Sequence, residues 1–467
     1  MTAPVSKPQQ VRVAIIGSGP AAFYTAEHLL KAGDGLVSVD MFERLPAPFG
    51  LVRYGVAPDH QKIKQVTRVF DRIAQHPGFR FFGNVEYGKH LQLNDLRRHY
   101  HQVCFATGAQ TDRELGIPGE GLERSHPATE FVAWYNGHPD FRDCRFDLSA
   151  ERAVIVGVGN VAVDVARILC RTPAELAQTD IADYALDALR SSRVREVIML
   201  GRRGPAQAAF TNPEAKELGE LEGADTLALP DEVTLDQATR NTLGEELDRD
   251  LTRKLEILQG FAAQQPTGKA RQLIIRFLVS PVALLDDGSG GVGGIRLTRN
   301  RLEQDGDYVR AIATSVQRDL PADLVFRSVG YRGVALPGIP FDHRRGIIPN
   351  ERGRIVDAQG TDIQGLYVSG WIKRGPTGVI GTNKPDGKET AEAMLADSSA
   401  GRTLGPERPG TAEALLRARQ KVVVSYPDWQ RMDTAETAAG AALGRPRVKL
   451  TDPAIMLRSV GREPALG

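Results

Sequence analysis

The apolar positions of residues 11–33 change their period halfway through the segment. In VRVAIIGSGPAAFYTAEHLLKAG, a continuous apolar run meets closely spaced glycines, and a helix-period pattern then follows and stops at Gly33. An apolar run bounded by glycines predicts a buried strand and a tight turn, and the 3.6-residue period predicts a helix. The same succession returns in RAVIVGVGNVAVDVARILC, residues 152–170. We therefore predict two strand–turn–helix units in one α/β chain.

The first unit has the spacing of a dinucleotide-binding turn. Gly17, Gly19 and Ala22 fit the pattern G-x-G-x-x-A, in which the glycines make the turn and admit a pyrophosphate, and the small third residue lets helix and strand pack closely. The next apolar run, LVSVDMFE, ends in Glu43, 24 positions after Gly19. A carboxylate there accepts hydrogen bonds from ribose hydroxyls and repels a 2′-phosphate, although an ordinary loop carboxylate is the alternative.

The second unit repeats this spacing but ends differently. Gly157, Gly159 and Ala162 stand in the same register, and the following apolar run, VREVIMLGRR, closes with Arg202 and Arg203. Two guanidinium groups there offer bidentate donors to the 2′-phosphate of NADP, whereas most exposed arginine pairs are solvated loops. Arg202 lies 43 positions after Gly159, farther than usual, and we predict extra helix in the intervening segment.

Two nucleotide sites in one chain predict electron transfer between two cofactors. FAD held in the first site and NADP(H) in the second is the economical interpretation, because a hydride then has an acceptor. Glycine turns in QVCFATG and LPADLVFRSVGYRG predict domain borders near residues 110 and 330. We expect a surface hairpin over residues 284–306, and we expect the segment GLYVSGWIKRGPTG to return the chain to the first domain. We expect two Rossmann-like domains. These are a discontinuous FAD-binding domain, residues 1–110 and 335–467 with a C-terminal extension from about residue 400, and an NADP-binding domain, residues 111–334.

Composition and charge argue against a nucleic-acid partner, a membrane span and a targeting segment. The chain has 467 residues, 41% of them hydrophobic, and a formal net charge of +1, which provides no general attraction to nucleic acid. No apolar run approaches the ~20 residues that a membrane span needs. Residues 1–10, MTAPVSKPQQ, have neither an apolar signal core nor an Arg-rich amphipathic pattern. We expect a cytoplasmic protein with a short disordered lead-in.

The cysteines exclude several neighbouring classes. Cys104, Cys144 and Cys170 are far apart and form no C-x-x-C pair, so we expect three reduced, mostly buried thiols. A disulfide reductase needs paired thiols, and a fused iron–sulfur module or another metal centre of that kind needs a cysteine cluster. The electron acceptor is therefore expected to be a separate molecule, and no metal site is predicted.

Four longer segments carry a family resemblance. GLVRYGVAPDH, GNVAVDVARIL, GRRGPAQAAFT and GWIKRGPTGVIGTN, together with DWQ…GRPRVKL near the end, resemble the family of adrenodoxin reductase and the bacterial FprA-type NADPH–ferredoxin reductases. The likeness runs from about residue 11 to the end of the chain. It implies a glutathione-reductase-like flavoprotein that passes electrons from NADPH through FAD to a small iron–sulfur protein, a ferredoxin, or to a flavodoxin.

The resemblance also implies site residues, position by position. Around FAD, in addition to the first glycine turn, it places Glu43, Leu51, Tyr87 (backbone only, since the family often has Val there), Trp371, Gly378, Val379 and Ile380. Around NADP it places Arg113, Val158, Gly159, Asn160, Val161, Arg202, Arg203, Glu214 and Gly378. Disulfide-reductase relatives have an Asp where Trp371 stands.

The resemblance implies two residues near the nicotinamide, and the positions of three basic residues suggest a surface for the protein partner. His60 and Glu217 match residues near the nicotinamide, where they would orient its amide or exchange a proton; the residues alone favour a helix N-terminal His and a surface acid. Arg53, Lys373 and Arg374 are candidates for a basic docking surface, the alternatives being contacts to cofactor phosphate or a solvated loop. A flavin monooxygenase and a non-catalytic NADP sensor remain as rival functions.

Overall fold

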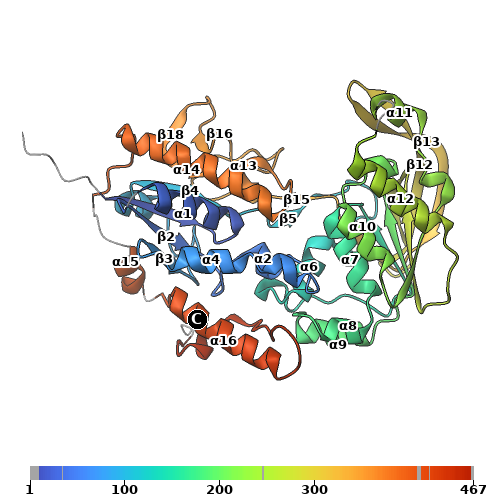
Figure 1. The fold of residues 1–467 in the computed structure, drawn as a ribbon, viewed down its shortest axis with the longest axis horizontal. Helices are drawn as coiled ribbons and strands as arrows, with labels where there is room; N and C mark the ends of the chain where they lie inside the picture. Colours follow the sequence, from blue (N-terminus) through green and yellow to red (C-terminus); the bar gives the residue numbers. More distant parts are fainter. Residues whose placement is uncertain (1–9, 34, 244–246, 408–411, 420, 464–467) are drawn as a thin grey trace, which may run out of the picture.

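The structure, a computed structural model, describes residues 10–33, 35–243, 247–407, 412–419 and 421–463. The predicted N-terminal lead-in falls on residues 1–9, outside the described residues. The described chain forms two lobes (Figure 1). Among the described residues, no helix has the length and apolar character needed to cross a membrane.

The first lobe is built on a seven-stranded sheet. Its strands, in spatial order, are β16 (Asn350–Glu351), β17 (Arg354–Val356), β18 (Asp362–Val368), β4 (Gln102–Phe105), β1 (Val11–Ile16), β2 (Val37–Phe42) and β3 (Phe79–Phe82). The helices of this lobe are α1 (Pro20–Ala32), α2 (Leu51–Tyr54), α3 (Gln61–Lys64), α4 (Thr67–Ala74), α5 (Leu93–His99), α13 (Trp371–Arg374) and α14 (Asn383–Ser399). Strands from both ends of the chain thus share one sheet, which pairs β18 with β4 in parallel.

The second lobe is built on a six-stranded parallel sheet. Its strands, in spatial order, are β6 (Ser125–Pro127), β14 (Leu324–Arg327), β7 (Arg152–Val156), β8 (Glu196–Leu200), β10 (Arg271–Arg276) and β9 (Ala224–Ala228). Its helices are α6 (Ala128–Tyr135), α7 (Asn160–Cys170), α8 (Pro173–Ala177), α9 (Asp183–Arg190), α10 (Asn212–Gly219), α11 (Gln237–Leu243) and α12 (Arg249–Ala263). The extra helix predicted before the arginine pair is present as α8 and α9. The two Rossmann-like units predicted from the glycine spacing are thus confirmed as the centres of two sheets.

An antiparallel sheet of three strands covers the second lobe. It contains β11 (Val279–Asp286), β12 (Val292–Asp305) and β13 (Tyr308–Pro321), and β11 and β12 form the hairpin predicted over residues 284–306. Buried apolar side chains fill the space between this sheet and the parallel one, among them Ile198, Leu284 and Val325.

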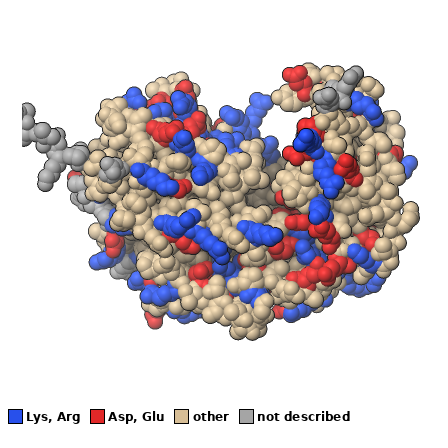
Figure 2. Space-filling view, viewed as in Figure 1, with Lys and Arg blue, Asp and Glu red and all other residues tan. Residues whose placement is uncertain are grey.

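The two lobes are joined by a short ribbon. β5 (Thr111–Asp112) leaves the first lobe and pairs antiparallel with β15 (Tyr331–Arg332), on which the chain returns. The ribbon lies close to the predicted domain borders at residues 110 and 334, which stay a prediction. Figure 2 shows the surface hollowed between the lobes, with acidic and basic side chains interspersed over this face.

The C-terminal extension packs on the first lobe. It contains α15 (Ala412–Ala418), α16 (Tyr426–Ala441) and α17 (Pro453–Ser459). Trp429, Met432 and Leu457 belong to the same buried cluster as Phe49 and Phe70. The three thiols are free, with Cys104 and Cys170 buried and Cys144 partly buried, as the sequence predicts.

Candidate functional site

The first glycine turn joins β1 to α1 and leaves open space at the start of the helix. Gly17 has φ +103°, and a Cβ there would lie 2.4 Å from the carbonyl oxygen of Ala106, so the turn requires glycine. Gly19 is the N-cap of α1, and a Cβ on it would meet nothing within 4 Å. Unpaired N–H groups beside open space suit a pyrophosphate. Ala22 is fully buried, which allows α1 to approach the sheet, and the turn therefore fits FAD.

Glu43 follows β2 and is held against this turn. The hydroxyl of Ser18 donates to Glu43 Oε2 at 2.7 Å, and the backbone N–H of Leu45 donates to Oε1 at 3.0 Å. A carboxylate has about four acceptor positions, so both oxygens retain room for ribose hydroxyls. The geometry fits the predicted contact.

Two more predicted FAD contacts lie near the same sheet edge. Leu51 follows Gly50, and a Cβ on Gly50 would lie 3.1 Å from Cα of Gly19, so this segment runs beside the first glycine turn. Tyr87 donates its hydroxyl to the carbonyl oxygen of Pro337 at 2.6 Å, which fixes its ring and leaves the backbone role predicted for it untested.

The turn after β18 lies against α1, although the two are far apart in the sequence. A Cβ on Gly370 would lie 2.5 Å from the Cβ of Ala21, and the N–H of Gly370 donates to Asp386 Oδ2 at 2.5 Å. Trp371 comes next and packs on Tyr331 of β15, with ring centroids 5.5 Å apart. Trp371 therefore lies where the first lobe meets the ribbon of β5 and β15 that joins the two lobes, which we call the hinge ribbon.

Gly378, Val379 and Ile380 lead into the long helix α14. Gly378 has φ +77°, Val379 is 52% exposed, and a 3-10 turn that begins at Ile380 continues directly into the helix. Exposed apolar surface at a helix start suits a flat ring, and the N–H groups there favour negative charge on it.

The second glycine turn, residues 157–161, has the same design as the first. A Cβ on Gly157, at φ +137°, would lie 2.2 Å from the carbonyl oxygen of Ser328, whereas a Cβ on Gly159 would meet nothing within 4 Å. Asn160 opens α7, and its Oδ1 is buried with no hydrogen-bond partner among the described residues. The two valines of the turn are half-buried against the core. Open space and a buried free acceptor at a helix N-terminus fit a bound dinucleotide.

Arg202 and Arg203 follow β8 beside this turn. Within the part of the chain that the structure describes, neither guanidinium has an ion-pair partner. Burial, and then repulsion from Arg202, lower the pKa of Arg203. Two adjacent unpaired cations form a site for a doubly charged anion.

Arg113 and Glu214 are the outermost predicted NADP contacts. Arg113 is exposed just after β5, with its backbone N–H donating to the carbonyl oxygen of Gly330 at 2.9 Å. Glu214 Oε2 accepts from the N–H and the hydroxyl of Thr211, which makes it part of the capping box of α10. This cap gives Glu214 a structural role, and its contact to NADP stays a prediction.

The structure brings His60 and Glu217 together across the two lobes. His60 Nε2 lies 2.8 Å from Glu217 Oε2. Arg167 Nη1 donates to the same oxygen at 3.0 Å, and Glu217 Oε1 accepts no hydrogen bond from the described residues. Burial disfavours the imidazolium, but the bond to Glu217 and nearby carboxylates raise the pKa of His60. The bond from His60 lowers the pKa of Glu217.

Arg167 is the centre of this cluster, and sequence reasoning missed it. Its side chain is 0% exposed and donates to Asp59 at 2.6 and 3.0 Å, to Asp164 at 2.7 Å and to Glu217. Arg171 adds a third bond to Asp59, at 2.7 Å. The D-x-x-R spacing on an otherwise apolar helix face was the available signal, because a buried charge on such a face needs a partner.

The predicted docking role is wrong for two of the three basic residues. Arg53 is 5% exposed and forms a bidentate pair with Glu436 at 2.8 and 2.5 Å. Lys373 is 6% exposed and pairs with Asp386 at 2.9 Å and with a second carboxylate of α14. Buried, neutralised cations cannot form a basic docking surface. Arg374 is partly exposed and hydrogen-bonds Asn383 at 3.0 Å, so its docking role stays a prediction.

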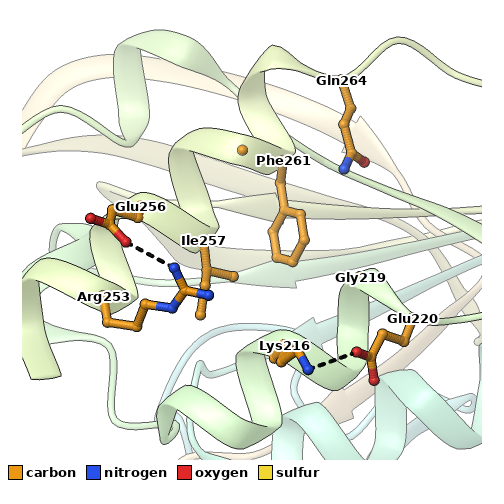
Figure 3. A pocket seen from close by; sticks show the side chains of 9 residues that line it. Lys216, Gly219, Glu220, Arg253, Glu256, Ile257, Phe261 and Gln264 are labelled. Carbon is orange, nitrogen blue, oxygen red and sulfur yellow. Dashed lines mark hydrogen bonds and ion pairs between the residues drawn. The ribbon is translucent and has the colours of Figure 1, made fainter.

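One groove lies apart from both nucleotide turns. It has a volume of about 320 Å³ and runs between α10 and α12, over Ile257 and Phe261 (Figure 3). Its ion pairs, Lys216–Glu220 and the Arg253 pair, stay within their own helices and do not close it. It contains none of the predicted nucleotide contacts.

Two glycine turns, one with a carboxylate and one with an arginine pair, define a two-dinucleotide oxidoreductase of the flavoprotein class. The family model "Pyridine nucleotide-disulphide oxidoreductase" matches residues 11–199. The chain is 47% identical to "NADPH-ferredoxin reductase FprA" of Mycobacterium tuberculosis, over 96% of this chain and 98% of that one. It is 44% identical to "NADPH:adrenodoxin oxidoreductase, mitochondrial" of Bos taurus, over 97% and 92%.

A solved structure agrees with these relatives. "Mycobacterium tuberculosis FprA in complex with NADPH" superposes with a TM-score of 0.89 and 46% identity, covering 97% of this chain and 100% of that one. The chain belongs to the family of NADPH–ferredoxin and NADPH:adrenodoxin reductases.

Proposed function

We propose that the protein is an FAD-dependent reductase that takes electrons from NADPH and delivers them singly to a ferredoxin or a flavodoxin. The observation that carries the proposal is the pair of arginines beside the second glycine turn, which have no ion-pair partner among the described residues, together with Glu43, which Ser18 holds against the first turn. Bound FAD accepts two electrons with a hydride and releases them one at a time, as a one-electron iron–sulfur acceptor requires.

The chain's own residues bind and orient the two nucleotides. Glu43 holds the unphosphorylated ribose of FAD, and Arg202 and Arg203 hold the 2′-phosphate of NADPH. Glu217 is fixed through Oε2 by His60 and Arg167, so its free Oε1 accepts a hydrogen bond from the carboxamide of the nicotinamide. This contact sets which face of the ring meets the flavin and its distance, which is the larger part of catalysis in hydride transfer.

A cytoplasmic location belongs to the same proposal. Cys104, Cys144 and Cys170 are free thiols, and unpaired cysteines suit a reducing compartment, where disulfides are rare. Fractionation of the host cells with detection of the protein tests the location. Recovery in the membrane or secreted fraction would contradict it.

The first expected result is the cofactor content. The purified protein should carry one non-covalent flavin, which chromatography after denaturation should identify as FAD, because the first turn accommodates a pyrophosphate and Glu43 a second ribose. The FAD should be reduced by NADPH much faster than by NADH. FMN, or a colourless protein that cannot be reconstituted with FAD, would contradict the proposal.

The pair of His60 and Glu217 should make stability depend on pH. Because the pKa of His60 is raised in the fold, the pair stabilises fully below the ordinary His value of about 6.5 and the gain is lost as pH rises through the raised pKa. Glu217→Gln should therefore lower Tm more at pH 6 than at pH 9. Glu220→Gln is the control and should show no such difference, because Glu220 caps the end of the same helix and its one ion pair among the described residues is with Lys216. An equal loss at both pH values would show that His60 does not titrate against Glu217.

A further inference from the structure

The segment between α16 and α17 leaves the lobe on which those helices pack. We call residues 442–452 the C-terminal strap. In Figure 1 the chain after α16 runs across to α8 and α9 of the second lobe before it returns to α17. The hinge ribbon of β5 and β15 lies at a different place along the border between the lobes. The strap is therefore a further non-covalent connection between the lobes, in addition to the ion pairs that His60 and Asp59 of the first lobe form with Glu217 and Arg167 of the second.

Arg445 fastens the strap to the loop between α8 and α9. Its side chain is 5% exposed. Nε donates to the carbonyl oxygen of Thr179 at 3.1 Å, Nη2 to that of Ile181 at 2.5 Å, and Nη1 to Asp183 at 2.6 Å. One buried guanidinium thus donates to three partners on the second lobe, which makes this a specific attachment.

Lys449 makes contacts to both lobes from one ammonium group. Its side chain is 1% exposed, and Nζ donates to the carbonyl oxygen of Arg53 in the first lobe at 3.2 Å and to that of Asn136 in the second at 3.1 Å. Asp180 of the second lobe lies 3.4 Å away, and Lys64 of the first lobe also binds it, at 2.6 Å. Burial works against ionised Asp180, but the two lysines hold its pKa at about 2.

Glu436 of α16 holds residues 447–450 of the C-terminal strap against that helix. This buried carboxylate accepts from Arg53, from Arg447 at 3.1 Å and from the N–H of Leu450 at 2.7 Å. Gly440 lies so close to the strap that a Cβ on it would be 2.4 Å from Cα of Arg447. The strap thus has one defined path, and movement of the second lobe would break its contacts.

We propose that the C-terminal strap is a positioning element that sets the angle between the two lobes, with Arg445 and Lys449 as its anchors. The proposal rests on the proposed function, in which the adenylate end of NADPH binds one lobe and the flavin binds the other. Domains linked by short connections move relative to one another by default. Hydride transfer needs the reacting atoms about 3–3.5 Å apart, and a misplacement of about 1 Å costs roughly a hundredfold in rate. The strap adds a fixed point to the cross-lobe ion pairs around Arg167 and further limits the hinge motion that would misplace the nicotinamide.

The test is the double variant Arg445→Met, Lys449→Met, compared with Arg462→Met. Arg462 belongs to the same extension, is 48% exposed and pairs with Asp428 of α16, away from the second lobe. In the double variant the rate constant of flavin reduction by NADPH should fall by at least about tenfold. Affinity for 2′,5′-ADP, which occupies the adenylate site alone, should change less than about twofold, and FAD content should stay at one per chain. Hydrogen exchange should rise in residues 179–183, and the control should match the wild type throughout.

Three outcomes of this experiment would overturn the proposal. An unchanged reduction rate with faster exchange in residues 179–183 would show that the strap does not position the nicotinamide. A loss of 2′,5′-ADP affinity or of FAD equal to the loss of rate would show a general structural role. If the double variant does not fold, Asp183→Ala, which removes one exposed partner of Arg445, should still lower the rate about twofold or more and raise the exchange. A wild type that NADPH does not reduce would refute the proposed function, whereas unchanged hydrogen exchange of residues 179–183 in the double variant would refute the strap on its own.

Discussion

The double variant Arg202→Ala, Arg203→Ala is expected to lose about a hundredfold in kcat/KM with NADPH and little with NADH. Each charge-assisted contact to the 2′-phosphate is worth about 1.5–3 kcal/mol, and 1.4 kcal/mol corresponds to a factor of ten. Neither guanidinium has an ion-pair partner among the described residues, so removing them leaves no carboxylate unpaired. The loss should therefore affect the reaction with NADPH and not the stability of the fold.

Steady-state kinetics with ferricyanide as acceptor measure this preference without a protein partner. Arg190→Ala is the matched control, because Arg190 is an exposed arginine of the same lobe whose one ion pair within the described ranges is with Asp187. It should leave both coenzymes unaffected. A double variant with an unchanged ratio of NADPH to NADH efficiency would show that the arginines do not bind the phosphate.

The variant Arg167→Met is expected to lower the thermal stability of the holoenzyme strongly. It would leave Asp164 and Glu217 with His60 as their remaining partner, and Asp59 with Arg171, among the described residues. Removing one partner of a buried ion pair costs about 3–5 kcal/mol, and in a domain of 150–250 residues each kcal/mol shifts Tm by about 2–4 °C. We expect Tm to fall by at least about 6 °C.

The pH dependence separates this effect from a simple packing defect. Burial, opposed by Arg167 and His60, raises the pKa of Asp164 to about 6, so its ionisation costs stability as pH rises from the ordinary Asp value to that pKa. Without Arg167 the pKa rises further, and the loss of Tm should be larger at pH 8 than at pH 6. Arg171→Met, which removes a half-exposed neighbour from Asp59, should cost far less. Equal losses for the two variants would contradict a central role for Arg167.

The fold was predictable where the signal is local. Glycine turns, the apolar runs on either side of them, the helices before Arg202 and the hairpin after residue 284 all depend on neighbours in the sequence, so periodicity and turn residues predict them. The path of the C-terminal strap was not predictable. It depends on the contact of Arg445 with Thr179, 266 positions away, and no local pattern encodes such a distance.

The site residues were predictable where they follow a local pattern or match the family. Glu43 and the arginine pair each close the apolar run that forms the strand after a glycine turn. Family resemblance supplied His60 and Glu217, whose contact the structure shows. Arg53 was misassigned because its partner, Glu436, is 383 positions away. From the sequence alone, a basic residue in a glycine-rich loop looks exposed, and only the fold shows the carboxylate that buries it.

Anaerobic double-mixing stopped-flow spectroscopy tests the central claim most directly. The protein is first mixed with one equivalent of NADPH and then with an excess of oxidised ferredoxin from the host. Flavin absorbance should be lost in the first step and recovered in the second, with two ferredoxins reduced for each NADPH consumed, because each accepts one electron. Flavin that is reduced by NADPH and stays reduced in the presence of both ferredoxin and flavodoxin, and is reoxidised only by oxygen, would contradict it.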